Sequence, residues 1–540
     1  MSAASTNSVH IPKSTLDIKE LVEKAQVGTE QYLRDALSND LVDLQLFEDA
    51  IDRTVPNLEQ WLCSDDIDRV SPNAKRGIAA AILDQRWEAV VNAFRRDLSF
   101  GTGGIRGMMA FDRSSIERLK EDGIDAPILK GPNTLNNIVL LRVSAGVARF
   151  GQSKGLSKIV IGYDSRIRGG DFGRIIAELF LAYDFTVYFF DEPCPYPEVT
   201  FAIPYDEIKS DLGILISASH NDYRYNGYKL SCANGSQFDP QQRDEMYEQY
   251  IRKATFEDIH LCPLAQSRKS KLVFLGGSEK LPGVDYFDRD LLNIHDRHRD
   301  HILGQLVDPN RVREQNCSTA AIKLRLGYCA FHGVGRNAVP RLLHQVGIDV
   351  FNPITVNRLN DLNGLFPSFC SEPGREQQPD PGDPRAAKVA VEAFEKEYPG
   401  ELANTDIIIG TDPDADRCGV IVKVPERQCH LYGGDAFALL PADDMWALIV
   451  WYRLRSEICK HGKVVDPETK FIVQSVSTTN SIVRMARKFG LGVVMTWVGF
   501  ANLAAGTRMV WDREEIPPLS EGKRSATDDL CHPFIWEVAG

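Results

Sequence analysis

The sequence predicts an α/β protein in which three successive α/β units follow a helical N-terminal region. Two observations lead to this prediction. Short apolar runs of strand length alternate with segments of helical periodicity from residue 158 onward, and residues 14–98 show helical periodicity alone. At roughly 150 residues per domain, 540 residues correspond to three or four domains.

Composition and charge exclude several classes of protein. Hydrophobic residues make up 43% of the chain and charged residues 25%, which excludes a wholly disordered or collagen-like protein. No apolar stretch approaches the roughly 20 residues of a membrane-spanning helix. The net charge of -13 argues against non-specific nucleic-acid binding but permits a local basic pocket for a small anion.

The N-terminus and the cysteines indicate where the protein resides. The first residues, MSAASTNSVHIPKS, lack the apolar core of a secretion signal. The 11 cysteines show no CxxC motif and no regular spacing. We therefore expect a soluble protein of the reducing cytoplasm, with free thiols and with no membrane or nucleic-acid partner.

The helical region is expected to begin with a capping box formed by Ser14 and Asp17. A second apolar stripe predicts one helical stretch over residues 73–94. The charged sequence Arg95-Arg96-Asp97 then leads into a glycine-rich loop.

The alternating part of the chain predicts strands connected by crossover helices, and hence parallel sheet. We expect strands at residues 158–162, 186–190, 212–216, 324–331, 349–351, 406–409, 471–474 and 492–496. We expect helices at residues 171–182, 338–346 and 386–398.

The first candidate site is Ser217-Ala218-Ser219-His220-Asn221, directly after the strand at 212–216. Ligands of α/β proteins bind at the carboxyl ends of strands, and a serine there can act as a nucleophile. His220, Asn221 and Lys229 could stabilise a phosphoryl group on Ser219. Asn226-Gly227 predicts a tight turn that folds Lys229 back toward Ser219. The alternative is a polar loop whose side chains make only local hydrogen bonds.

The second candidate site is the acidic loop Gly410-Thr411-Asp412-Pro413-Asp414-Ala415-Asp416-Arg417 after the strand at 406–409. Three carboxylates at alternate positions repel one another unless a cation lies among them, and oxygen ligands suit Mg²⁺. An EF-hand is excluded, because Arg417 stands at its sixth position and Lys423 at its twelfth. The alternative is a solvated acidic turn.

The third candidate site is Gly101-Thr102-Gly103-Gly104-Ile105-Arg106-Gly107. Its backbone N–H groups and Arg106 could bind phosphate oxygens, and a flexible hinge is the alternative. The glycine spacing matches neither a Walker A nor a dinucleotide motif. We interpret His332 as a hydrogen-bonded histidine at a strand–helix turn, and Arg166 and Arg168 as electrostatic caps of their loop.

In chain order, the glycine-rich loop, the serine loop and the acidic loop resemble those of the α-D-phosphohexomutase family, which contains phosphoglucomutases and phosphomannomutases. The matching sequences include SASHNDYRYNGYKL, FHGVG and GTDPDADR, and the resemblance covers residues from about 100 to 500. The helical leader looks most like that of the branch with phosphoglucomutase-2-type and phosphopentomutase enzymes. The resemblance implies four domains around a central cleft, the first three sharing a mixed-sheet α/β core.

The resemblance also implies an activity, an interconversion of sugar 1-phosphate and 6-phosphate through a phosphoserine and a bisphosphate intermediate. Glucose phosphate is the first expected substrate, mannose phosphate the second, and a sugar bisphosphate the activator. The implied catalytic residues are Ser219, Lys229 and Arg106, and the implied Mg²⁺ ligands are Ser219, Asp412, Asp414 and Asp416. The implied substrate-binding residues are His220, Asn221, Arg417 and Gly499.

Several positions depart from the family pattern. Asp222 stands where proline is usual, and its charge would weaken phosphate binding unless it points away. Val498 and Ala501 replace a threonine and a lysine of the family's third-unit loop. Glu537 is a candidate start of the sugar loop, and no fourth-domain phosphate loop follows it.

We therefore expect a leader at 1–98 and units at 99–254, 255–430 and 431–540, the last incomplete and the fourth domain absent. Three alternatives to the hexose mutase follow. They are a truncated or degenerate homologue that binds sugar phosphate or Mg²⁺ without efficient turnover, a phosphopentomutase, and a phosphatase that uses the same serine. The sequence leaves the oligomeric state open.

Overall fold

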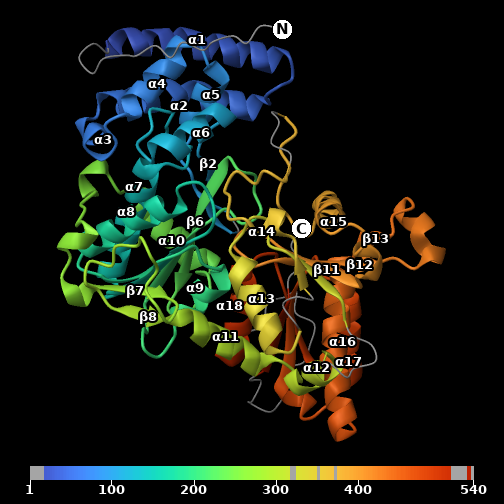
Figure 1. The fold of residues 1–540 in the computed structure, drawn as a ribbon. Coiled ribbons are helices and arrows are strands. Elements are labelled where there is room, and N and C mark those ends of the chain that lie inside the picture. The colour runs from blue at the N-terminus through green and yellow to red at the C-terminus, as the bar shows by residue number, and fades with distance from the viewer. Residues whose placement is uncertain are drawn as a thin grey trace.

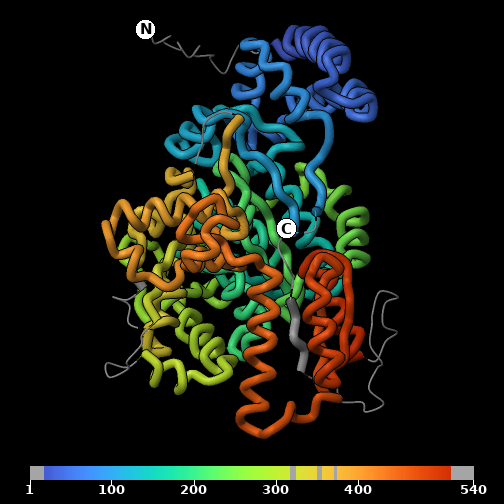
Figure 2. The backbone as a smooth tube through the Cα atoms, turned by 90° about the vertical axis from the view of Figure 1, so that its right-hand side faces the viewer, coloured from blue at the N-terminus to red at the C-terminus, as the bar shows by residue number. Residues whose placement is uncertain are grey.

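The computed structural model describes residues 17–101, 103–316, 324–348, 353–369 and 374–512, and the backbone of 532–536. Within them, the strands form three sheets, and a helical region precedes the first sheet. This helical region lies at one end of the molecule, and the third sheet with its helices lies at the opposite end (Figures 1 and 2). The predicted α/β fold with a helical N-terminal region is confirmed.

The N-terminal helical region consists of α1 (Ile18–Ser38), α2 (Leu44–Cys63), α3 (Asp65–Val70), α4 (Ala74–Leu83) and α5 (Trp87–Phe94). Asp17 is itself the N-cap of α1, because its carboxylate accepts a hydrogen bond from the Glu20 N–H. Ser14, its expected capping partner, lies outside the described residues. The single stretch expected at 73–94 is divided in two, since Gln85 adopts a left-handed φ of 55° between α4 and α5.

The helical region packs firmly on the first α/β unit. The Trp61 ring makes edge contacts with Phe94 at 5.9 Å and with Phe256 at 6.0 Å between centroids. The guanidinium of Arg69 donates to the carbonyl of Ile259 at 2.8 Å. These contacts fix α5 and the loop after it against the first sheet.

The first sheet has the strand order β1-β2-β6-β5-β3-β4-β7-β8. Its strands are β1 (Phe100–Gly101), β2 (Gly104–Met108), β3 (Lys158–Tyr163), β4 (Thr186–Phe190), β5 (Leu212–Ile216), β6 (Tyr225–Cys232), β7 (Leu272–Gly276) and β8 (Leu291–Asn293). The helices along this part are α6 (Arg113–Asp122), α7 (Asn137–Ser153), α8 (Gly169–Ala182), α9 (Tyr196–Ala202) and α10 (Pro240–Met246). Strands β5, β3, β4, β7 and β8, neighbours in this order in the sheet, pair in parallel, as the alternating pattern predicted. Strands β6, β2 and β1 pair antiparallel.

The second sheet has the order β10-β9-β11-β12-β13. Its strands are β9 (Leu326–Cys329), β10 (Pro353–Thr355), β11 (Ile407–Thr411), β12 (Cys418–Lys423) and β13 (Phe437–Leu439). The helices along this part of the chain are α11 (Ile294–Gln305), α12 (Pro309–Asn316), α13 (Gly335–Gln345), α14 (Asn357–Asn360) and α15 (Pro384–Glu397). Helix α11 contacts α9 and β7 of the first unit as well as α13. The strand expected at 349–351 lies outside the described residues.

The third sheet has the order β15-β14-β16, all in parallel. Its strands are β14 (Lys470–Ser475), β15 (Gly492–Thr496) and β16 (His532–Trp536). Its helices are α16 (Ala442–His461), α17 (Asn480–Phe489) and α18 (Phe500–Trp511). Glu537 lies outside the described residues.

The sheets divide the chain differently from the expected boundaries. Strands β7 and β8 follow the expected boundary between 254 and 255 but belong to the first sheet, so this sheet extends to Asn293, and the domain boundary itself stays a prediction. The boundary at 430 falls before β13, which pairs with β12 in the second sheet. These strands are only three to five residues long, and such short runs carry little periodicity.

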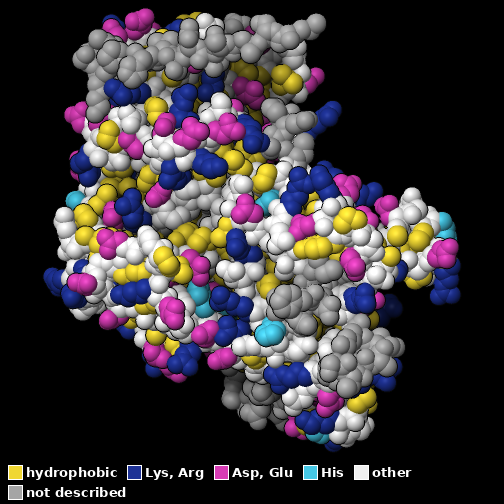
Figure 3. Space-filling view, in the orientation of Figure 1, with side chains coloured by type: hydrophobic (Ala, Val, Ile, Leu, Met, Phe, Trp, Pro, Cys, Tyr) yellow, Lys and Arg dark blue, Asp and Glu magenta, His cyan; other side chains and the backbone are white. Residues whose placement is uncertain are grey.

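Two surface features concern possible partners. Among the described residues, every helix is too short or too polar to span a bilayer. On the face shown in Figure 3, basic and acidic side chains are interspersed and do not gather into one region.

Candidate active site

The serine loop begins where the buried strand β5 ends. Ser219 lies two residues beyond Ser217 with a left-handed φ of 54°, which a non-glycine residue rarely adopts. The Ser217 hydroxyl holds this conformation, because it accepts the Ser219 N–H at 2.8 Å and donates to Asp414 Oδ2 at 2.6 Å. The side chain of Ser219 is thereby directed at the acidic loop of the second unit.

The acidic loop connects β11 to β12 and carries three carboxylates that face one another. Single oxygens of Asp412, Asp414 and Asp416 all lie within 4.8 Å of one another. The Ser219 hydroxyl donates to Asp412 Oδ2 at 2.8 Å. The four predicted metal ligands therefore lie together, although they come from two different sheets.

Two carboxylate oxygens of this cluster have no hydrogen-bond partner among the described residues. Burial, together with Asp414 and Asp416, raises the pKa of Asp412 well above its usual value. Asp414 Oδ1 and Asp416 Oδ1 are buried and accept no hydrogen bond from the described residues. Buried carboxylate oxygens without a partner are costly, so the donor set suits a hard divalent cation such as Mg²⁺.

Lys229 supplies the positive charge nearest to the acidic loop. Its Nζ lies 2.7 Å from Asp414 Oδ2 and 2.7 Å from Asp416 Oδ2. Burial alone disfavours the ammonium, but the carboxylates of Asp414 and Asp416 outweigh it and raise the pKa of Lys229. Ion pairing to Lys229 in turn outweighs burial and lowers the pKa of Asp414.

The tight turn predicted at Asn226-Gly227 is wrong. Both residues lie inside β6, which pairs antiparallel with β5 and places Lys229 opposite Leu215. Gly227 is required by packing, since a Cβ there would lie 2.3 Å from the Ser217 carbonyl oxygen. Lys229 therefore reaches the site along a strand and not around a turn.

Other predicted side chains lie beside the serine loop. Arg106 of β2 donates from Nη1 to Asn221 Oδ1 at 2.9 Å. His220 Nδ1 lies 3.3 Å from Ser219 Oγ, and burial with the nearby Arg417 and Arg106 lowers the pKa of His220 to about 3. The backbone N–H of Arg417 donates to Asp412 Oδ1 at 3.1 Å. The Nη1 atom of the Arg417 side chain is buried without a hydrogen-bond partner among the described residues.

Comparison with known proteins agrees with this arrangement. Residues 116–257 match the model of phosphoglucomutase/phosphomannomutase alpha/beta/alpha domain I, and residues 304–425 match that of domain II. The first match contains Ser219 and the second contains the three aspartates.

The chain belongs to the α-D-phosphohexomutase family.

Among its relatives is the phosphoglucomutase of Staphylococcus aureus strain USA300, 24% identical over 424 residues, which are 78% of this chain and 63% of the relative. The chain thus spans less than two thirds of the length of this relative. A crystal structure described as a putative phosphomannomutase from Thermus thermophilus superposes with a TM-score of 0.52 at 18% identity. The superposition covers 78% of this chain and 72% of the Thermus thermophilus chain, and the two share the phosphohexomutase fold.

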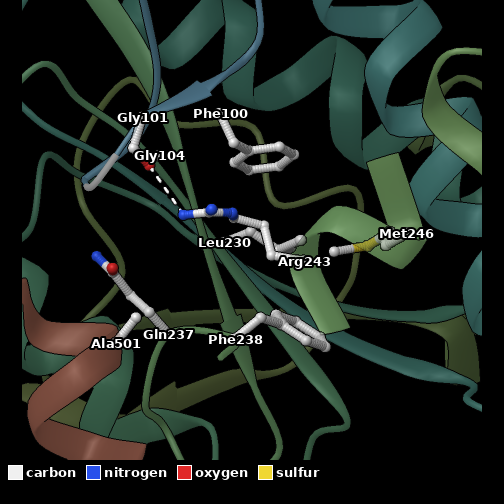
Figure 4. Close-up of a pocket in the computed structure, with 9 residues that line it drawn as sticks. All are labelled: Phe100, Gly101, Gly104, Leu230, Gln237, Phe238, Arg243, Met246 and Ala501. Atoms are coloured by element: carbon white, nitrogen blue, oxygen red, sulfur yellow. Dashed lines mark hydrogen bonds between the residues drawn. The ribbon is translucent and has the colours of Figure 1, made fainter. Parts of the chain in front are cut away.

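The glycine-rich loop forms the β1–β2 hairpin, and not a free hinge. Arg243 donates to the Gly101 carbonyl at 3.4 Å, and the two residues line a small pocket with Gly104 and Ala501 (Figure 4). Gly499 is the N-cap of α18, two residues before Ala501. The N-terminal end of α18 is thus adjacent to the hairpin, and a role of Gly499 in binding substrate stays a prediction.

Sequence reasoning missed the importance of Arg166. Its guanidinium is fully buried and donates to four carbonyls of the serine loop and the turn after it, those of Ser219, Asn221, Asp222 and Tyr225, at 2.5 to 2.8 Å. Asp164 Oδ2 lies 3.3 Å from its Nε. Arg166 is therefore a positioning residue for Ser219. Arg168 does not cap its own loop as expected, but donates to the Leu119 carbonyl near the C-terminal end of α6.

Two further residues agree with their interpretation. The carboxylate of Asp222 points away from Ser219 and pairs with Arg224 at 2.9 Å. His332 is buried, its Nδ1 lies 3.0 Å from the Asp361 carbonyl, and its Nε2 accepts the Ser368 N–H at 3.3 Å. Neither side chain is available to act on a substrate bound at Ser219.

Proposed function

We propose that this chain is a Mg²⁺-dependent mutase that interconverts a hexose 1-phosphate and 6-phosphate through phosphorylated Ser219. The observation that supports it best is the contact between the Ser219 hydroxyl and Asp412, beside two buried carboxylate oxygens that accept no hydrogen bond from the described residues. Curated relatives are named phosphoglucomutases, so glucose phosphate is the first substrate to test and mannose phosphate the second.

In this proposal, Asp412, Asp414, Asp416 and an oxygen on Ser219 hold the Mg²⁺. Bound there, the ion would neutralise charge on the phosphoryl group during transfer. Lys229 screens the carboxylates, and Arg106 adds a fixed guanidinium next to Asn221. A preorganised cationic site of this kind is what phosphoryl transfer requires from a protein.

Each half-reaction is one phosphoryl transfer. The free hydroxyl oxygen of the sugar phosphate forms a bond to phosphorus while the bond from phosphorus to Ser219 Oγ breaks. The hydroxyl proton ends on Ser219 Oγ, and the product of this half is a sugar bisphosphate. After the bisphosphate reorients, its other phosphate returns to Ser219, so added bisphosphate would act as an activator by phosphorylating the resting serine.

Four residues are proposed to contact the sugar phosphate: His220, Asn221, Arg417 and Gly499. His220 presents an uncharged imidazole beside Ser219, because its pKa lies near 3. Arg417 carries a buried Nη1 without a partner among the described residues, which suits a phosphate oxygen. We further propose a cytoplasmic location, in keeping with the scattered cysteines.

The test is a coupled assay that follows glucose 6-phosphate formation from glucose 1-phosphate with Mg²⁺ and a trace of glucose 1,6-bisphosphate. Wild type should turn over, Ser219→Ala should not, and Ser456→Ala on the outside of α16 should match wild type. Turnover by Ser219→Ala at the wild-type rate contradicts the proposal.

The same assay separates the alternatives. Phosphate release that exceeds isomerisation indicates a phosphatase, and faster turnover of ribose phosphates indicates a phosphopentomutase. Binding of bisphosphate without isomerisation indicates a homologue that has lost mutase turnover.

A further inference from the structure

A buried tyrosine that belongs to none of the three candidate loops lies against Lys229. Tyr196 is the first residue of α9 and is only 6% exposed. Its ring belongs to an apolar cluster of the first unit that includes Phe190 and Leu215. Lys229 Nζ lies 4.3 Å from the centroid of this ring, within the range of a cation–π interaction. The ammonium is therefore bordered by an aromatic face as well as by carboxylates.

Tyr196 also connects the strand that carries Lys229 to the acidic loop. Its hydroxyl lies 3.2 Å from the Ser231 hydroxyl, two residues after Lys229 on β6. Its backbone N–H donates to the Asp414 carbonyl of the second unit at 2.9 Å. The ring is thus fixed at its hydroxyl and at its backbone, with Lys229 over the face between them.

The position of Lys229 decides which carboxylate oxygens remain free. Its Nζ contacts the Oδ2 atoms of Asp414 and Asp416, both at 2.7 Å. The Oδ1 atoms of the same two carboxylates accept no hydrogen bond from the described residues. An ammonium that moved among the carboxylates would compete with the proposed Mg²⁺ for these Oδ1 atoms. An aromatic face attracts the ammonium without offering it an oxygen, so it favours one position of Nζ.

The ring that Lys229 faces is uncharged. Burial raises the pKa of the Tyr196 phenol, although the neighbouring Lys229 opposes this effect. The phenol therefore keeps its proton at neutral pH, and the contact with Lys229 is an interaction with the face of a neutral ring and not an ion pair with a phenolate.

We propose that Tyr196 is a positioning residue of the active site, whose ring holds the ammonium of Lys229 in place. This inference rests on the proposed mutase function and extends the site to α9. Tyr196 acts through Lys229 and not on the phosphoryl group itself. Side-chain variants keep the backbone N–H that binds the Asp414 carbonyl, so they isolate the contribution of the ring.

The first test measures the rate at which glucose 1,6-bisphosphate phosphorylates Ser219. Tyr196→Phe keeps the aromatic face and should react within about twofold of the wild-type rate. Tyr196→Leu removes the face and should slow the transfer roughly fivefold to thirtyfold, the range that a desolvated cation–π interaction supplies.

A fluorinated series separates attraction to the ring from packing of the ring. Phenylalanine with one, two or three ring fluorines is incorporated at position 196, which nearly keeps the volume but weakens the negative face stepwise. The transfer rate should fall with each added fluorine. Equal rates across the series would overturn the inference, because the ring would then only fill space.

A second readout does not depend on mutase activity. The chain is acetylated with acetic anhydride, and labelling of Lys229 is divided by labelling of Lys130, which is equally buried and donates to Ser71 and Asn137. Global loosening raises both labels, whereas loss of the ring should raise the Lys229 ratio roughly fivefold to thirtyfold in Tyr196→Leu. Added fluorines should raise this ratio stepwise.

The matched control is Phe190→Leu on β4. Phe190 is a buried ring of the same apolar cluster, but it lies beside His295 at 6.2 Å between ring centroids. This variant should leave the labelling ratio unchanged. Thermal unfolding identifies any leucine variant that fails to fold, and the fluorinated series, which keeps the core filled, then decides.

The outcomes separate this inference from the proposed function. If the fluorinated series changes neither the transfer rate nor the labelling ratio, the positioning role is wrong, even when wild type isomerises sugar phosphates. If Phe190→Leu raises the ratio as much as Tyr196→Leu, any loss from the cluster frees Lys229, which also overturns the inference. If wild type does not phosphorylate Ser219 but the ratio rises with each fluorine, the role of Tyr196 in holding Lys229 stands and the proposed function fails.

Discussion

Replacing Arg166 with methionine tests how the protein holds its serine loop. Methionine has a similar length and fills the space, but it removes the donors to the carbonyls of Ser219, Asn221, Asp222 and Tyr225. It also removes the ion-pair partner of Asp164, whose carboxylate is completely buried.

The magnitude follows from these contacts. Breaking a buried ion pair by removing one partner costs about 3–5 kcal/mol, because the other charge stays buried. Burial already raises the pKa of Asp164 to about 6 against the opposing charge of Arg166, so without Arg166 the carboxyl would take up a proton, which limits this cost. Carbonyls that lose their donor add to the loss unless water replaces it. We therefore expect Arg166→Met to lower the free energy of unfolding by about 4 kcal/mol.

The assay combines denaturant unfolding with the rate at which glucose 1,6-bisphosphate phosphorylates Ser219. Arg166→Met should lose both stability and phosphorylation rate. Arg168→Met is the matched control, since Arg168 caps α6, and it should lower stability by about 1 kcal/mol with phosphorylation unchanged. The double variant Arg166→Met/Asp164→Leu should be more stable than Arg166→Met alone, because the unpaired carboxyl is gone.

Two results would refute this reasoning. One is an Arg166→Met protein as stable as wild type. The other is a destabilised Arg166→Met protein that, still folded, phosphorylates Ser219 at the wild-type rate, which would show that the four hydrogen bonds do not position the serine.

Two further predictions concern the rest of the fold. Burial disfavours the charged imidazole of His295, but hydrogen bonds to Glu192 and Glu198 outweigh it and raise its pKa from 6.5 to about 10. The folded value lies above the unfolded one, so this stabilisation is complete below pH 6.5 and is lost as the pH rises to 10, by up to about 1.4 kcal/mol per pH unit. His295→Gln should flatten that part of the stability profile measured by denaturant unfolding, and parallel profiles of variant and wild type would contradict the assignment. Gly227→Ala places a Cβ 2.3 Å from a backbone oxygen of the serine loop and should lower the free energy of unfolding by about 1–3 kcal/mol. Gly304→Ala is the control, since a Cβ there meets open space, and it should leave the stability unchanged. Equal stability of the two variants in the same unfolding assay would show that the serine loop can shift freely.

The parallel core of the fold could be predicted because its strands are continuous apolar runs. The strands expected at 158–162, 186–190 and 212–216 coincide with β3, β4 and β5 within one residue. The antiparallel strands β6, β2 and β1 could not be predicted in this way. In β6, Asn226-Gly227 has the composition of a turn. Only the neighbouring strand shows why glycine is needed there, through the close approach of the Ser217 carbonyl.

The site could be predicted where its reactive residues lie close together in the sequence. Ser219 and the three aspartates stand out because each follows a strand and each carries reactive groups at short spacing. Arg166 does not stand out, because its partners are backbone carbonyls 53 to 59 residues away, and any residue type supplies a carbonyl.

The most direct test of the account is the site and metal dependence of phosphorylation. The intact mass of the chain is measured after incubation with glucose 1,6-bisphosphate and Mg²⁺, the phosphorylated residue is located by fragmentation, and glucose 1-phosphate is then added. The account predicts one phosphoryl group on Ser219, its absence in the presence of a Mg²⁺ chelator and in Asp414→Asn, and its removal by glucose 1-phosphate with formation of bisphosphate. Phosphorylation at another residue, or a phosphoserine that forms without Mg²⁺ and does not transfer to the sugar, would contradict it.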